Sequence, residues 1–151
     1  MTEKEKYHPL TPAEEPKFTP TEITDKILRG VAFNESRGKE APYTFQQPSG
    51  DEAMGDAIGK YQITEGELAS YGEKFLGFKV KPGWFLNEPE WQDTYMKNKI
   101  AFLESEGLDI PEILALHRAG ISGWGDPVRV RAKVLERGAY IQSALEYMKT
   151  L

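Results

Sequence analysis

The chain has 151 residues, of which 39% are hydrophobic and 28% charged, and its formal net charge is −5. This balance indicates one globular domain with a proper core, and it excludes a collagen-like, low-complexity or wholly disordered chain. The lack of cysteine excludes disulfide scaffolds, thiolate metal sites and cysteine nucleophiles. With only two histidines, a multi-histidine zinc site is not expected. The acidic net charge disfavours generic nucleic-acid binding.

Residues 1–20 are expected to form an extended, proline-rich arm. Prolines recur there every three or four residues, and each one removes a backbone donor and biases the preceding residue toward extended geometry. Such an arm serves either as a docking segment for a larger assembly or as a disordered terminus. No apolar run approaches the roughly 18 residues of a membrane span, and the charged first residues do not fit a secretory signal.

Residues 21–151 are predicted to fold into a mainly α domain (α+β at most) with five or six helices. Thr21 caps a first helix that runs to about Ser36, and residues 38–58 form a long loop with a short hairpin around 43–47. A capping box at Thr64 and Glu67 opens the second helix, and residues 77–87 form another loop. Later helix starts are predicted at Pro89, Asp109 and Asp126, with a break at Gly138.

Glu35 is the first candidate for chemistry. At about 100° per residue it lies about 120° from Ile23, inside the apolar arc that ends with Leu28 at about 140°. A carboxyl on a buried stripe is uncommon unless it is paired or functional, and desolvation raises its pKa. A carboxyl that stays protonated can act as a general acid on a glycosidic oxygen. The alternative is a helix-terminal residue that turns into solvent.

Four short motifs follow one another along the chain. The first is Glu35-Ser36-Arg37-Gly38, and the second is Ala57-Ile58-Gly59-Lys60-Tyr61-Gln62-Ile63. The third is Leu116-His117-Arg118-Ala119-Gly120, and the fourth is Glu136 followed by Tyr140-Ile141. Their order and content resemble those of lytic transglycosylases and phage muramidases with a lysozyme-like fold. The chain departs from that family's pattern at Asp56, where glycine is usual, at Lys60-Tyr61 in place of Leu-Met, and at His117-Arg118 in place of Tyr-Asn.

The resemblance implies cleavage of the β-1,4 bond between N-acetylmuramic acid and N-acetylglucosamine in peptidoglycan, with Glu35 as acid and then base. It also implies substrate-binding positions. They are Ser36, Gly59, Tyr61, Gln62 and Tyr140. At Gly59 a Cβ would obstruct the sugar, and Gln62 would bond the catalytic carboxyl or an N-acetyl group. The Tyr140 hydroxyl would contact Glu35 or the substrate. Tyr140 could also be an ordinary core aromatic. His117 is expected to be a packing residue, and Arg118 replaces the asparagine with which the family contacts sugar.

A second carboxylate would decide the reaction type. Most glycosidases use two carboxyls, roughly 5–5.5 Å apart for retention and roughly 6.5–9.5 Å for inversion, whereas lytic transglycosylases need one. The loop that faces the expected cleft offers Asp51, Glu52 and Asp56. Asp56 is the candidate that would hold a water and make the enzyme a hydrolase, or it is simply an exposed loop acid.

Aromatic side chains would supply platforms for sugar rings. Trp124 directly follows the third motif between two glycines, a setting that favours exposure, and Trp84, Tyr43 and Tyr61 also lie in loops or motif positions. Trp91 and Tyr95 are on a helical face and are expected in the core.

The expected partners are the glycan strands of peptidoglycan and, through the arm, virion or secretion-machine proteins, with no nucleic acid, metal or organic cofactor. The chain would be made in the cytoplasm without a signal peptide and act on the cell wall or periplasm, in bacteriophage lysis or as part of a virion. The rival readings are a muramidase that uses a loop carboxylate, a chitin hydrolase, and a non-catalytic virion or structural protein that retains the fold.

Overall fold

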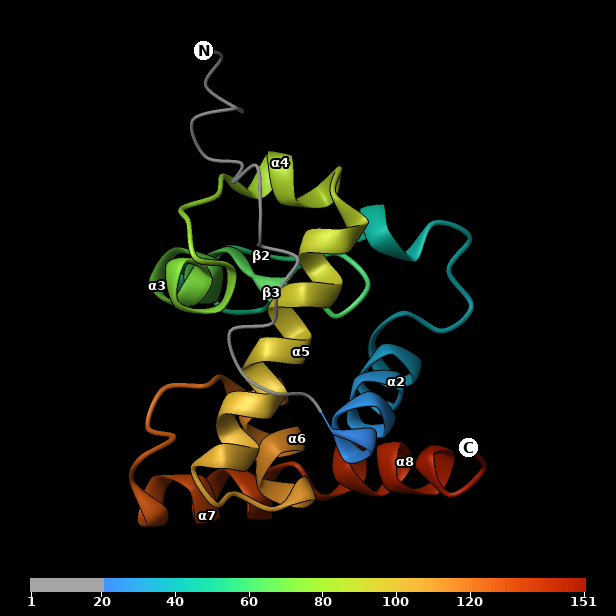
Figure 1. The fold of residues 1–151 in the computed structure, drawn as a ribbon, viewed down its shortest axis with the longest axis vertical. Coiled ribbons are helices and arrows are strands. Elements are labelled where there is room, and N and C mark those ends of the chain that lie inside the picture. Colours follow the sequence, from blue (N-terminus) through green and yellow to red (C-terminus); the bar gives the residue numbers. More distant parts are fainter. Residues whose placement is uncertain (1–20) are drawn as a thin grey trace.

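The computed structural model describes residues 21–151, so the predicted arm lies outside the described residues (Figure 1). The prediction of a mainly helical fold with little strand is confirmed. The elements in chain order are α2 (Glu22–Ser36), η1 (Pro42–Thr44), β1 (Gln46–Pro48), η2 (Glu52–Met54), β2 (Asp56–Ile58), β3 (Ile63–Thr64), α3 (Glu65–Leu76), α4 (Pro82–Leu86), α5 (Pro89–Ser105), α6 (Ile110–Ala119), α7 (Pro127–Glu136) and α8 (Gly138–Met148).

Helix α5 runs through the middle of the described chain (Figure 1). Helices α3 and α4 and the small sheet lie around one half of it, and α6, α7 and α8 lie around the other half. Helix α5 is buried nearly all round, with Tyr95 and Leu103 fully buried and Trp91 4% exposed, as predicted for the two aromatics. A helix with so little exposed surface forms because it is covered from several sides, not because of one amphipathic stripe.

Side-chain caps begin most of the helices where the sequence predicts them. Thr21 and Asp109 each complete a capping box, which satisfies backbone donors at the starts of α2 and α6. Asp126 accepts hydrogen bonds from the first backbone amides of α7, ahead of Pro127 at the first helical position. The predicted break at Gly138 separates α7 from α8.

Three local predictions need correction. The loop 77–87 contains the short helix α4, which begins at Pro82. Thr64 caps α3 as expected, but the Glu67 carboxyl does not return to the cap, because it binds Lys99 and Tyr95 in the core. On α2, Ile27, Leu28 and Val31 are buried as predicted, whereas Ile23 is 48% exposed.

The sheet has three antiparallel strands in the order β1-β2-β3. Its hairpin joins Gln46–Pro48 to Asp56–Ile58, slightly later than the predicted 43–47, and pairs Gln47 with Ala57. Because side chains alternate along a strand, Asp56 and Ala57 point to opposite faces of this sheet. That alternation decides which of them faces the site described next.

Candidate active site

A cleft of about 630 Å³ separates the sheet and α3 from the end of α6 and the turn after it. Gln47, Asp51 and Gln62 line the sheet side, and residues 117–122 line the opposite side. Glu35, at the last turn of α2, lies between the two. The cleft therefore brings three of the four sequence motifs to one place.

The Glu35 carboxyl is nearly enclosed, with only 7% of the side chain exposed. Tyr140 donates a hydrogen bond of 2.8 Å to Oε2, and Arg118 Nη1 lies 3.7 Å from Oε1. Burial raises the pKa of Glu35 above its usual value. The Tyr140 bond and the charges of Arg118 and Lys99 oppose that rise without cancelling it. The carboxyl thus holds its proton to higher pH than an exposed glutamate does.

Tyr140 owes its position to the packing of α8 against α2. Asn34 Nδ2 donates a 2.8 Å hydrogen bond to the Tyr140 carbonyl, and Ser143 Oγ donates a 2.8 Å bond to Asn34 Oδ1. Burial, followed by the Glu35 charge, raises the pKa of Tyr140 well above its usual value, so the phenol stays protonated and donates. The expected contact between Tyr140 and Glu35 is present, and the reading of Tyr140 as an ordinary core aromatic does not account for it.

His117 is a buried neutral imidazole at the back of the cleft. Its Nε2 lies 2.6 Å from the Tyr61 carbonyl, and its Nδ1 lies 2.8 Å from Lys99 Nζ. A lysine only donates, so Nδ1 accepts and Nε2 carries the proton that bonds the carbonyl. Burial and the Lys99 charge lower the pKa of His117 well below its usual value. His117 Nε2 is 4.0 Å from Glu35 Oε2, too far for a hydrogen bond, and the neutral imidazole makes no ion pair there, so the contacts of His117 are those of the packing residue that we expected.

A buried ion pair continues this network into the core. Lys99 Nζ lies 2.9 Å from both carboxylate oxygens of Glu67, and Tyr95 donates a 2.7 Å hydrogen bond to Glu67 Oε2. Lys99 is 1% exposed and Glu67 5%. Each charge has its partner and further hydrogen bonds, which is the condition under which a buried pair persists. The network joins α3, α5 and α6 behind Glu35.

Gln62 lines the cleft but does not bond the catalytic candidate. Its Nε2 donates to the Gly59 carbonyl at 2.9 Å, and its Oε1 accepts from Gln47 Nε2 at 2.9 Å. Its backbone has φ 53°, a left-handed conformation that is rare for a residue other than glycine and is found disproportionately at functional sites. The predicted contact with the Glu35 carboxyl is therefore replaced by a role in holding the turn.

Gly59 and Tyr61 face away from the cleft. Gly59 has φ 80°, and a Cβ there would lie 2.6 Å from Gln92 Cδ, so the glycine makes room for Gln92 and not for a sugar. Tyr61 is 2% exposed and donates a 2.5 Å hydrogen bond to Asp93. Both were expected to bind substrate, and both belong to the packing on the other side of the turn.

Ser36 and Trp124 are also outside the cleft lining. The Ser36 hydroxyl turns back to donate to the Ala32 carbonyl at 3.1 Å. Trp124 packs edge-on against Phe102, with ring centroids 4.9 Å apart, and is only partly exposed. The flanking glycines suggested an exposed platform, but the aromatic pair in the core holds the indole.

Asp56 does not face Glu35. Its carboxylate accepts a 2.8 Å hydrogen bond from Gln46 Nε2, and its neighbour Ala57 lines the cleft from the opposite face of the strand. The loop acid that does line the cleft is Asp51, whose Oδ1 accepts a 3.0 Å hydrogen bond from the Ala53 amide. The loop singled out in the sequence does line the cleft, but through Asp51 and not through Asp56.

Arg137 is a cleft residue that sequence reasoning missed. It lines the cleft at the junction of α7 and α8, and its Nε is buried with no hydrogen-bond partner within residues 21–151. A buried donor without an acceptor costs about 1–3 kcal/mol, which a turn of the guanidinium toward a ligand oxygen would relieve. The available signal was its place one residue after Glu136 of the fourth motif.

Across residues 21–151 there is no group of three or more histidine and acidic side chains that could hold a metal ion. None of the helices in this range has the length and apolar character needed to cross a membrane. Comparison of the chain with known protein families, with curated proteins and with solved structures gives no match. The case for function therefore depends on the cleft itself and on the motifs.

Proposed function

We propose that the protein cleaves the β-1,4 bond between N-acetylmuramic acid and N-acetylglucosamine in peptidoglycan, as a lytic transglycosylase with one catalytic carboxyl. The observation that carries this proposal is the Glu35 carboxyl, 7% exposed, bonded by Tyr140 and lying in a cleft of about 630 Å³. A cleft of this size is typical of a binding site. Most of the side chains that line it are polar or charged, which suits a ligand rich in hydroxyl and amide groups. The resemblance of the four motifs supplies the substrate class.

Glu35 would act first as a general acid. With its pKa raised by burial, it gives its proton to the glycosidic oxygen as the bond to the muramic acid C1 breaks. The neighbouring N-acetyl group of the substrate stabilises the positive charge at C1. The Glu35 carboxylate then takes the proton from the C6 hydroxyl, whose oxygen bonds to C1 and closes a 1,6-anhydro ring. Tyr140 holds the carboxyl in place in both steps.

The engagement of the other carboxyls in the cleft favours this route over hydrolysis. Glu67 lines the cleft, but its oxygens are bound by Lys99 and Tyr95. Asp51 caps the short helix η2. If the enzyme is instead a muramidase, Asp51 is the loop carboxylate placed to hold a water, because Asp56 lies outside the cleft lining.

We also propose a setting in bacteriophage lysis or in a virion, with residues 1–20 as the docking segment for virion or secretion-machine proteins. This proposal follows from the location of peptidoglycan outside the cytoplasm. The cleft residues described above lie between Glu35 and Arg137, so docking and cleavage would use different stretches of the sequence.

The test is digestion of purified peptidoglycan in ¹⁸O-labelled water, followed by mass spectrometry of the muramic acid ends. We expect unlabelled 1,6-anhydro ends, lighter by one water than the hydrolysis product. Glu35→Gln should lower the rate at least about a hundredfold, since general acid catalysis contributes about 10²–10⁴. Glu40→Gln, at an exposed glutamate outside the cleft lining, is the matched control.

Each rival has its own outcome in this experiment. Labelled reducing ends that Asp51→Asn suppresses would identify the muramidase, and Asp56→Asn should leave either product unchanged. Cleavage of chitin in place of peptidoglycan would assign the chitin hydrolase. Wild-type protein that digests neither polymer, while folded, would leave the non-catalytic reading.

A further inference from the structure

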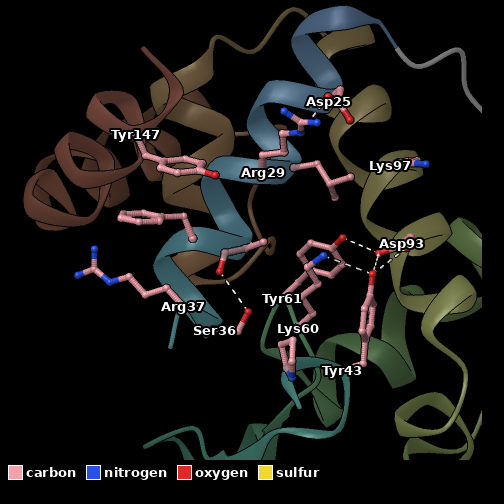
Figure 2. Close-up of a pocket in the computed structure, with 14 residues that line it drawn as sticks. Asp25, Arg29, Ser36, Arg37, Tyr43, Lys60, Tyr61, Asp93, Lys97 and Tyr147 are labelled. Atoms are coloured by element: carbon pink, nitrogen blue, oxygen red, sulfur yellow. Dashed lines mark hydrogen bonds and ion pairs between the residues drawn. The ribbon is translucent and has the colours of Figure 1, made fainter. Parts of the chain in front are cut away.

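A second pocket, of about 460 Å³, lies between α2, the loop that contains η1, and α5. Figure 2 shows its side chains. Consecutive residues at the end of α2 line different cavities. Glu35 lines the cleft, whereas Ser36 and Arg37, the residue that follows the helix, line the second pocket. Within residues 21–151 no residue lines both, so the pocket is a separate site.

One wall of the pocket is a stacked column. The rings of Phe33 and Tyr147 are parallel, 4.2 Å apart at 7°, and the Arg37 guanidinium lies 4.4 Å from the centre of the Phe33 ring. Stacking fixes the plane of the guanidinium without using its N–H groups. Arg37 thus offers a positioned fork of donors at this wall.

The opposite wall joins Lys60 to a tyrosine pair. Tyr43 and Tyr61 both donate hydrogen bonds to the Asp93 carboxylate, at 3.0 Å and 2.5 Å (Figure 2). Burial and Asp93 raise the pKa of Tyr43 to about 12, so the hydroxyl keeps its proton and continues to donate. The Lys60 ammonium lies 4.9 Å from the centre of the Tyr43 ring and 3.3 Å from its hydroxyl. The Asp93 carboxylate already accepts two hydrogen bonds, whereas Lys60, within the described part of the chain, uses only one of its N–H donors, on the Tyr43 hydroxyl.

The remaining charged residues of the lining leave the pocket with a net positive charge. Arg29 pairs with Asp25 at 3.4 Å, and the exposed Lys97 makes no ion pair within residues 21–151. The lining holds four cationic and two carboxylate side chains, in a chain whose formal net charge is −5. Both carboxylates are bound by neighbours, whereas Arg37, Lys60 and Lys97 have no carboxylate partner among the described residues.

We propose that this pocket binds an acidic peptide segment, with its carboxylates on Arg37, Lys60 and Lys97 and its hydrocarbon parts against the aromatic walls. Three cations from three different elements suit a ligand with several spaced anionic groups better than a single compact anion. The planar guanidinium of Arg37 matches a carboxylate in a bidentate arrangement. Aromatic walls favour an organic ligand over an inorganic one. This site does not require that the cleft cleave a glycan.

The test is a titration of the full, ¹⁵N-labelled chain with acetyl-triglutamate, followed by NMR. We expect saturable shifts at the amides of Arg37, Tyr43 and Lys60, with a dissociation constant below about 10 mM and weakening as salt is added. Arg37→Gln with Lys60→Gln should weaken binding about tenfold or more. The matched control is Lys79→Gln, an exposed lysine that lines neither pocket nor cleft.

Several results would overturn the proposal. One is chemical shifts that do not saturate, and another is shifts confined to residues of the cleft. A third is an affinity for acetyl-trialanine amide equal to that for acetyl-triglutamate. An equal affinity for inorganic phosphate would mean a general anion site. If the double variant does not give a well-dispersed spectrum, Lys97→Gln replaces it, because its exposed side chain leaves the core untouched. Unchanged affinity in that variant would likewise count against the site.

Discussion

The phenol of Tyr140, on α8, donates a 2.8 Å hydrogen bond to Oε2 of Glu35, on α2, from a position 105 residues further along the chain. This bond lowers the pKa of Glu35 against the larger effect of burial. It stabilises the ionised carboxylate, so it matters most when Glu35 has given up its proton.

Tyr140→Phe should move the alkaline limb of the pH–rate profile upward. A general acid must be protonated, so activity falls as pH rises through the pKa of Glu35. Removing the hydroxyl removes an influence that lowers that pKa, and the limb shifts to higher pH. The rate at the optimum should fall about tenfold or more, since a hydrogen bond to a charged group contributes about 1.5–3 kcal/mol. An unshifted limb would show that Glu35 does not govern it.

Glu35→Gln should be more stable than the wild type at neutral pH. Burial raises the folded-state pKa of Glu35 above 4.5, so the folded chain binds the proton more tightly than the unfolded chain does. Wild-type stability therefore falls as pH rises from about 4.5 through the raised pKa, and then levels off. Urea unfolding should show the two proteins converging toward pH 4.5 and separating above it. Glu40→Gln should follow the wild type, and a gap independent of pH would contradict the expectation.

Lys99→Met should lower the free energy of unfolding by about 3–5 kcal/mol, because it leaves the Glu67 carboxylate buried without its partner. Adding Glu67→Gln should recover part of that loss. The surface pair of Arg29 and Asp25, each 57% exposed, is the comparison, and Arg29→Ala should change stability by about 0.5 kcal/mol or less. Equal losses from the buried and the exposed pair would mean that the core network contributes nothing special.

Arg137→Met should raise KM about tenfold and leave kcat nearly unchanged. Arg137 lines the cleft and its Nε has no acceptor within residues 21–151, so the guanidinium is free to turn toward a substrate oxygen. Arg131→Met, an exposed position on α7 outside the cleft lining, is the control. A fall in kcat at constant KM would instead mean that the contact forms only in the transition state.

Gly59→Ala should lower the free energy of unfolding by about 2 kcal/mol or more. Alanine is strained at φ 80°, and its Cβ would meet the Gln92 amide. Gly125→Ala, where φ is not positive and no atom lies within 4 Å of the added Cβ, should be nearly neutral. Chemical denaturation of the two variants measures the difference. Equal stability would show that the turn can shift to accept a side chain.

Local signals predicted most of the helices. Caps at Thr21, Asp109 and Asp126 act within a few residues, so the sequence specifies them without knowledge of the fold. The role of Glu67 could not be found in this way. Its spacing from Thr64 is that of a capping box, but burial beside Lys99 binds its carboxyl more strongly than a surface cap would.

In the candidate site, too, local patterns predicted some residues, whereas others depend on tertiary structure. Glu35 was found because helical periodicity places it in an apolar arc and the Glu-Ser motif singles it out, and the Tyr140 contact was expected from the resemblance of the fourth motif. Asp56 was chosen over Asp51 because it stands where the resembled family usually has glycine. The structure turns its side chain away from the cleft, and a one-residue change of strand register would reverse which side chains of the strand face it. Short strands in a long loop leave that register undetermined in the sequence.

The contact between Gly59 and Gln92 makes the residue types that are tolerated at these two positions depend on each other. Gln92 holds Lys60, Tyr43 and Phe85 through three hydrogen bonds of its amide, and it occupies the space that any side chain at position 59 would need. A side chain at position 59 would require the Gln92 amide to move or to be shortened, with the loss of those bonds. Remote relatives should therefore be recognised more selectively by a glycine in the Gly-Lys-Tyr-Gln segment together with a Trp-Gln pair early in a later helix than by the segment alone.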